Sequence, residues 1–128
     1  MDNVIALGVD LVDVARIKRS IDRHGDRFLE RVFTPDEIAY AGDKKRRFEH
    51  LAARFAAKEA ALKAIGTGWR SGIAWTDIEV RSLASGEPAL SVYGRAGELA
   101  REKNIDRWLI SLSHTETLAF ASVIGLDA

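Results

Sequence analysis

The chain has 128 residues, of which 47% are hydrophobic and 30% charged, and its 19 basic and 19 acidic residues leave no formal net charge. These values predict one globular domain with a single core, and they do not indicate nucleic acid or an anionic membrane surface as a partner. The absence of cysteine excludes disulfides, thiolate metal sites and a cysteine nucleophile.

The first predicted element is a buried strand over residues 4–9, a short apolar run rich in β-branched side chains. The N-terminus lacks the basic start and long apolar run of a signal peptide, and no stretch approaches the ~20 apolar residues of a membrane-spanning helix, so we expect a cytoplasmic location. Asp10 follows the strand, and residues 11–23 have helical periodicity. Asp10 therefore has two interpretations, an N-cap or an oxygen ligand at the carboxyl end of a strand.

The predicted first helix has a basic face. Arg16, Arg19 and Arg23 recur at helical spacing, and Arg27 would continue the row if Gly25 only kinks the helix. One interpretation is an ordinary solvated face. The other is a local positive patch that docks an acidic protein surface.

A further helix start is indicated at Thr34, because Pro35 and Glu37 follow it in the pattern of a capping box. That helix is expected to end at Gly42, and the long helix to begin directly after it, at position 43. Its first turn contains four consecutive basic residues, 44–47. A solvated helix start and a phosphate contact are both open there, but no aromatic side chain interleaves the run, so we expect no nucleic-acid partner.

The stretch RFAAKEAALKAIGTG, residues 54–68, reads as the second half of the long helix followed by a glycine pair. Glu59 lies within the apolar stripe of this helix, so its carboxylate must be partly desolvated and needs a cation. Two cations are available, either Lys63 one turn later or a metal ion. The segment 66–68 can cap the helix, and its backbone N–H groups can also approach a phosphate.

The remaining sequence predicts strands around one helix. The expected strands are 77–83, 89–93, 108–113 and 118–124, with a turn at 85–88 and a helix at 95–103. His114 falls in the last turn, where a polar turn residue is a commoner role than a catalyst. The order of elements predicts an α+β fold, with a single small domain over residues 1–128 and a mixed or antiparallel sheet packed against the long central helix.

Three motifs spread over nearly the whole chain can be compared with known families. The first is Gly8-Val9-Asp10 followed by Arg16, the second is residues 54–68 with the run 72–80, and the third is Ser111-Leu112-Ser113-His114 with the small-residue strand 119–123. Together they resemble the AcpS-type holo-acyl-carrier-protein synthases, which are 4′-phosphopantetheinyl transferases. The resemblance implies that family's fold and an enzyme of fatty acid biosynthesis. Such enzymes transfer the phosphopantetheine arm of coenzyme A to a serine hydroxyl of apo acyl carrier protein, releasing adenosine 3′,5′-bisphosphate, and use Mg²⁺.

The resemblance also implies roles for individual residues. Asp10 and Glu59 would bind Mg²⁺, which takes hard oxygen ligands together with substrate phosphates, and Lys63 would be the third catalytic residue. The serine proton would pass to Glu59 or to a metal-bound water, and both routes stay open. The implied coenzyme A contacts are Arg54, Lys58, Gly66, Thr67, Gly68 and His114, with residues 44–47 as candidates for the nucleotide's 3′-phosphate.

The resemblance further implies protein partners. Arg16 matches a carrier-binding position of the family, and Arg19, Arg23 and Arg27 follow from helix geometry. A homotrimer is expected, with active sites at subunit interfaces to which residues 69–75 or His114 of a neighbouring subunit could contribute. Two alternatives remain open at this point, the same chemistry on a polyketide or peptide synthase carrier, and a coenzyme A-binding protein without catalysis.

Overall fold

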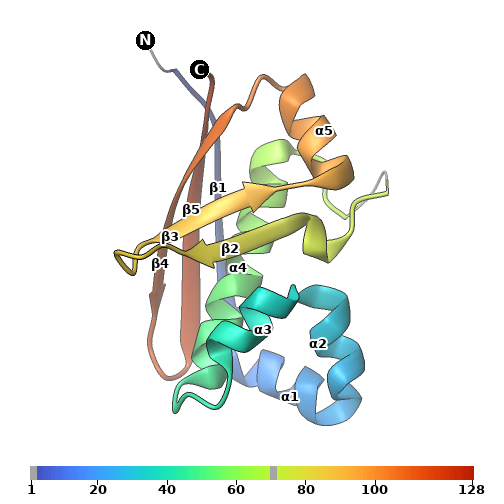
Figure 1. Cartoon of the computed structure of the whole chain (residues 1–128), viewed down its shortest axis with the longest axis vertical. Helices are drawn as coiled ribbons and strands as arrows, with labels where there is room; N and C mark the ends of the chain where they lie inside the picture. The colour runs from blue at the N-terminus through green and yellow to red at the C-terminus, as the bar shows by residue number, and fades with distance from the viewer. Residues whose placement is uncertain (1–2, 70–71) are drawn as a thin grey trace.

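The computed structural model describes residues 3–69 and 72–128 (Figure 1). Its elements in chain order are β1 (Val4–Asp13), α1 (Val14–His24), α2 (Asp26–Val32), α3 (Pro35–Ala41), α4 (Arg47–Ile65), a 3₁₀ turn (Trp75–Asp77), β2 (Ile78–Ser82), β3 (Pro88–Val92), α5 (Gly94–Glu102), β4 (Arg107–His114) and β5 (Leu118–Leu126). One sheet has the order β1-β5-β4, the other is the β2-β3 hairpin, and every pairing is antiparallel. The predicted α+β fold is confirmed.

Helix α4 lies at the centre of the molecule, between the three-stranded sheet and the β2–β3 hairpin that crosses it (Figure 1). Helices α1, α2 and α3 gather at one end of α4, and α5 lies at the other end with both termini. Because neighbours cover α4 on several sides, its buried residues include many alanines rather than one apolar stripe. Small side chains on both the helix and β5, such as Ala60 and Ala121, let the two elements approach closely.

Gly8 fixes the closest approach of β1 to α4. A Cβ atom added to Gly8 would lie 1.8 Å from the carbonyl oxygen of Ala60 and 3.1 Å from the amide nitrogen of Ala64. Glycine is therefore required here for space, since its φ angle is not among the positive ones. The contact brings Asp10, two residues along β1, beside the last turns of α4.

The structure confirms the local cap signals. The Thr34 hydroxyl accepts from the Glu37 amide, and the Glu37 carboxylate accepts from the Thr34 amide, which completes the predicted capping box. Gly66 ends α4 in the left-handed conformation with φ 89°. Both signals lie within one turn of sequence, where local chemistry decides the backbone.

Two predicted boundaries are wrong. β1 runs on to Asp13, which pairs with Leu118, so Asp10 lies inside a strand and cannot cap a helix. The residue at the N-cap position of α1 is instead Asp13, which makes no side-chain cap hydrogen bond. The long helix begins at Arg47 rather than at position 43, because residues after Gly42 form turns closed by the amides of Lys44 and Arg47.

The sheet face that points away from α4 is apolar and exposed. Leu7, Leu11 and Leu109 have exposed fractions of 63%, 60% and 52%, and Phe120 on the strand between them is also exposed. Within the described part of the chain, no helix is both long and apolar enough to cross a membrane. The cytoplasmic location stays a prediction.

Candidate active site

Asp10 and Lys63 form an ion pair where β1 meets α4. The Lys63 Nζ atom lies 2.9 Å from Asp10 Oδ1 and donates a second hydrogen bond of 3.0 Å to the carbonyl oxygen of Val9. The Asp10 side chain is 18% exposed and that of Lys63 is 56% exposed, so the pair lies at the surface. In residues 3–69 and 72–128 no ion pair joins Lys63 to Glu59, so of the two cations considered for Glu59 the structure does not supply Lys63.

Glu59 precedes Lys63 by one helical turn and is half-buried, as its place in the apolar stripe predicts. Its Oε1 atom accepts a hydrogen bond of 3.4 Å from the indole nitrogen of Trp69. The Trp69 ring lies against Trp75, with 3.5 Å between ring centroids, and Trp75 stacks on Phe55 at 5.0 Å. The described residues give Glu59 no ion-pair partner, so this aromatic cluster is what orients its carboxylate.

Lys58 lies in the interior and not at a ligand-accessible surface. Its side chain has no exposed area, its Nζ atom lies 2.8 Å from Glu37 Oε1, and it donates to the carbonyl oxygens of Ile78 and Trp75. Burial lowers the pKa of Lys58, and the Glu37 carboxylate opposes that effect. The structure therefore does not support the predicted contact of Lys58 with coenzyme A. Nothing local could reveal Glu37 as its partner, because the two residues meet only in the fold.

Arg54 and His114 line one cavity of about 350 Å³ on another side of α4, together with Tyr40, His50, Ser82 and Pro88. The Arg54 guanidinium lies 4.1 Å from the centre of the Tyr40 ring and donates to the Ser82 hydroxyl at 3.3 Å. Burial lowers the pKa of Arg54, while Tyr40 and Glu37 raise it. This cavity has an arginine, two histidines and a tyrosine ring, which suits a phosphate group attached to a flat base.

The His114 imidazole packs edge-on against His50, with 5.7 Å between ring centroids. Burial lowers the pKa of His50, and the charges of Arg54, His114 and Lys44 lower it further against the opposing effect of Glu49. On its other side His114 faces Glu49, with 3.8 Å between Nδ1 and Oε2. Glu49 is not among the site residues predicted from the sequence.

The predicted site residues thus divide into two groups. Arg54 and Lys63 lie nine positions apart on α4, which places them on opposite sides of the helix and roughly 13 Å apart along its axis. Asp10, Glu59 and Lys63 belong to the first group, and Arg54 and His114 to the second. Of the loop after α4, Gly66 is the helix cap, and Thr67 and Gly68 lead to Trp69 of the first group.

The basic face of α1 lies next to the first group. Arg16, Arg19 and Arg23 are exposed and line one shallow hollow. The Arg16 guanidinium lies 5.3 Å from the centre of the Phe55 ring, one turn before Glu59 on α4. Arg27 does not continue this row, because Gly25 ends α1 with φ 57° and Arg27 lines a separate hollow with residues of α2.

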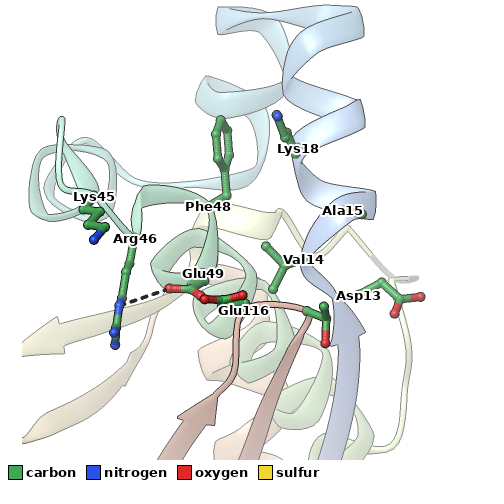
Figure 2. Close-up of a pocket in the computed structure, with 10 residues that line it drawn as sticks. Asp13, Val14, Ala15, Lys18, Lys45, Arg46, Phe48, Glu49 and Glu116 are labelled. Carbon is green, nitrogen blue, oxygen red and sulfur yellow. Dashed lines mark ion pairs between the residues drawn. The ribbon is translucent and has the colours of Figure 1, made fainter.

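The basic run 44–47 does not line the cavity of the second group, although Lys44 lies at its edge. Lys44 donates to the carbonyl oxygen of Tyr40 and lies over its ring. Lys45 and Arg46 line a different cavity, of about 510 Å³, with Lys18, Glu49 and Glu116 (Figure 2). A contact of this run with the 3′-phosphate stays a prediction.

The Asp10 and Glu59 carboxylates have the donor chemistry for Mg²⁺. This ion takes hard oxygen ligands and is commonly held by one or two carboxylates with substrate phosphates and water. Nowhere in the described ranges does a group of three or more histidine or acidic residues surround one point. The close contact at Gly8, which leaves no room for a Cβ atom, brings the strand with Asp10 against the helix with Glu59. The residues therefore fit a metal shared with a phosphate-bearing substrate.

Comparison with known proteins connects this arrangement with a family. A sequence model of the 4′-phosphopantetheinyl transferase superfamily matches residues 6–119. The holo-[acyl-carrier-protein] synthase of Solibacter usitatus is 50% identical over 121 residues, which are 94% of this chain and 97% of that protein.

Solved structures show the same relationship. The holo-[acyl-carrier-protein] synthase of Neisseria meningitidis has a TM-score of 0.84 at 34% identity and covers 96% of this chain and 98% of its own. The Helicobacter pylori holo-[acyl-carrier-protein] synthase, solved in complex with coenzyme A, has a TM-score of 0.81 at 31% identity and covers 93% and 98%. The predicted recognition is confirmed, and this chain belongs to the holo-[acyl-carrier-protein] synthases of the 4′-phosphopantetheinyl transferase superfamily.

Proposed function

We propose that Asp10, Glu59 and Lys63 form the catalytic centre at which this enzyme transfers 4′-phosphopantetheine from coenzyme A to a serine hydroxyl of an apo acyl carrier protein. The observation that carries the proposal is the close contact of Gly8 with Ala60, because this packing of β1 on α4 brings the Asp10 carboxylate to Lys63, one turn after Glu59 on the helix. Coenzyme A is the donor in this family, as the complex of the Helicobacter pylori relative illustrates. The carrier of fatty acid biosynthesis is the proposed acceptor.

In the transfer, the serine Oγ–P bond forms and the bond from that phosphorus to the oxygen of adenosine 3′,5′-bisphosphate breaks. Such reactions need alignment and charge neutralisation more than covalent catalysis. Mg²⁺ held by Asp10 and Glu59 would neutralise charge on the pyrophosphate oxygens. Lys63 holds Asp10 in place and keeps an exposed ammonium that can contact the phosphates. Glu59 accepts the serine proton, since Asp10 is already engaged by Lys63, whereas among the described residues Glu59 accepts a hydrogen bond from the Trp69 indole alone.

We assign the nucleotide end of coenzyme A to the cavity lined by Arg54 and His114. The segment 66–68 is the proposed contact for the coenzyme A phosphates on the side of the first group, through the amides of Thr67 and Gly68, since the Gly66 amide already donates to the Leu62 carbonyl oxygen. Lys58 is left out of the binding site because of its burial. The exposed face of Arg16, Arg19 and Arg23 is the proposed docking surface for the acidic carrier, with Arg27 as a neighbouring contact.

We further propose that the enzyme is a homotrimer with shared active sites. Two observations support this proposal. The two groups of site residues lie on opposite sides of α4, and the sheet face with Leu7, Leu11 and Leu109 is apolar and exposed. A second copy covering that face would let the Arg54 cavity of one subunit approach the Asp10 cluster of the next. Leu11→Glu is expected to produce monomers in sedimentation, while Leu83→Glu on the other hairpin is not.

A mass assay tests the function. The protein is mixed with coenzyme A, Mg²⁺ and apo carriers from fatty acid, polyketide and peptide synthases, and the expected result is a metal-dependent gain of the phosphopantetheine mass by the fatty acid carrier. Asp10→Asn and Glu59→Gln should abolish the gain, while Asp13→Asn, a nearby exposed control, should not. Binding of coenzyme A without any gain of mass would instead indicate a coenzyme A-binding protein without catalysis. A gain confined to another carrier would correct the acceptor.

A further inference from the structure

Two buried polar atoms that face each other lack hydrogen-bond partners. Among the buried side-chain nitrogen and oxygen atoms of residues 3–69 and 72–128, the unpartnered ones are Glu49 Oε2, Arg54 Nε and His114 Nδ1. Glu49 Oε2 and His114 Nδ1 lie 3.8 Å apart, which is close enough for an ion pair but longer than a hydrogen bond. A buried polar atom without a hydrogen-bond partner destabilises the folded state, so a small movement that forms the hydrogen bond between these two atoms is favourable.

The surroundings of Glu49 direct its carboxylate toward the histidine. Its side chain is 11% exposed and lies between the first turn of α4 and the turn that joins β4 to β5 (Figure 2). The same Oε2 atom is 3.7 Å from Arg46 Nε, an ion pair whose arginine side chain is 68% exposed and therefore weak. Glu116 lines the same cavity but is exposed to solvent.

The surroundings of His114 show which of its nitrogens can meet a ligand. The imidazole is 23% exposed, and Nδ1 is the buried nitrogen turned toward Glu49. This leaves Nε2 as the nitrogen available to the cavity that His114 shares with Arg54. His50 packs against the imidazole in a T-shaped arrangement, and Arg54 is the one arginine or lysine among the described residues that line that cavity.

We propose that Glu49 is a positioning residue that holds a proton on Nδ1 of His114 and thereby fixes Nε2 toward the nucleotide cavity. A carboxylate behind a histidine selects the tautomer and ring orientation in many sites, and loss of such a partner typically costs about 10–100-fold in affinity or activity. When a phosphate occupies the cavity, the imidazole carries a proton on each nitrogen, one donated to Glu49 and one to the phosphate. The ligand role of His114 rests on the proposed function, whereas its tautomer does not.

Nitrogen NMR of the histidine-labelled protein tests the tautomer directly. At a pH where His114 is neutral, the wild-type protein is expected to show a protonated Nδ1 and an unprotonated Nε2. Glu49→Ala should shift the tautomer toward protonated Nε2, and Glu49→Gln, whose amide oxygen can still accept, should preserve the wild-type pattern. Glu116→Ala is the matched control, because Glu116 lines the cavity of about 510 Å³ that Glu49 also lines. A wild-type signal with protonated Nε2, or an unchanged tautomer in Glu49→Ala, would overturn the proposal.

Kinetics provide the second measurement. Glu49→Ala is expected to raise the KM for coenzyme A by about 10-fold or more while leaving the KM for the carrier and the melting temperature near wild type. Rescue of the coenzyme A KM by Glu49→Gln supports positioning through a hydrogen bond. Equal changes in both KM values would overturn it and indicate a general structural effect. If wild-type protein modifies no carrier, the proposed function fails, and the NMR result still decides the role of Glu49.

Discussion

Gly8→Ala tests whether close packing of β1 on α4 builds the catalytic centre. The added methyl carbon would lie 1.8 Å from the Ala60 oxygen, whereas ordinary contacts begin at 3.4 Å. The Ala60 oxygen is a backbone atom and the added carbon is bonded directly to the backbone, so no side-chain rotation can relieve the clash. Strand β1 must therefore move away from α4 by roughly 1.5 Å, and overpacking of this kind costs about 1–3 kcal/mol of unfolding free energy. For a domain of this size that loss lowers the melting temperature by roughly 4–15 °C.

The same displacement should affect catalysis more strongly than stability. A withdrawal of β1 would open the 2.9 Å contact between Lys63 and Asp10, and a misplacement of about 1 Å can cost on the order of 100-fold in rate. The assay is phosphopantetheine transfer at a temperature well below the melting point of every variant, with thermal unfolding measured in parallel.

Gly97→Ala is the matched control for this experiment. Gly97 is also buried and lies on α5, outside the proposed site, and a Cβ added to it would lie 3.1 Å from the Val92 oxygen of β3. This variant should show a smaller stability loss and unchanged kcat. If Gly8→Ala kept both the wild-type melting temperature and the wild-type rate, the argument that this contact places Asp10 would be refuted.

Three further predictions concern the core, the cavity histidines and the docking helix. Lys58→Met should destabilise the protein by about 3–5 kcal/mol, because it leaves the buried Glu37 carboxylate without its cation, and combining it with Glu37→Gln should recover part of that loss in denaturant unfolding. A wild-type stability with a raised coenzyme A KM would instead return Lys58 to the binding site. The pKa of His50 is lowered from 6.5 in the folded state, so as the pH falls the histidine is protonated in the unfolded chain before it is protonated in the folded protein. The free energy of unfolding should therefore decrease as the pH falls below about 6.5. His50→Gln should flatten this dependence relative to wild type, and equal slopes for the two proteins would contradict the assignment. Arg16→Glu should raise the KM for the carrier without changing the KM for coenzyme A, whereas Arg101→Glu on the distant helix α5 should change neither KM. An unchanged carrier KM in Arg16→Glu would contradict the assignment of α1 as the docking surface.

Features decided by neighbouring residues could be predicted from the sequence. The Thr34 and Glu37 capping box and the Gly66 helix cap depend on contacts within a turn or two, and the structure confirms both. The predicted end of the first strand was wrong because β1 continues as far as Asp13, which pairs with Leu118. A prediction from neighbouring residues cannot include a pairing partner so far along the chain.

The site shows the same division. The motifs identified Asp10, Glu59 and Lys63, but the helical spacing suggested a Glu59–Lys63 pair, and the fold instead supplies Asp10 as the partner of Lys63. The indole of Trp69 on Glu59 and the carboxylate of Glu49 behind His114 were not foreseen, because each belongs to a segment whose local pattern indicates only a loop or a helix start.

The measurement that tests the central claim most directly is subunit complementation. Asp10→Ala and His114→Ala each inactivate a different group of the proposed shared site. In a trimer formed from an equal mixture of the two chains, a site is intact when the subunit that supplies Asp10 carries only His114→Ala and the subunit that supplies His114 carries only Asp10→Ala. This combination is expected at about a quarter of the sites. A doubly substituted chain mixed equally with wild type should also retain about a quarter of the activity, because both contributing subunits must be wild type. If the first mixture stays inactive and the second retains about half, each site lies within one subunit and the shared-site account is contradicted.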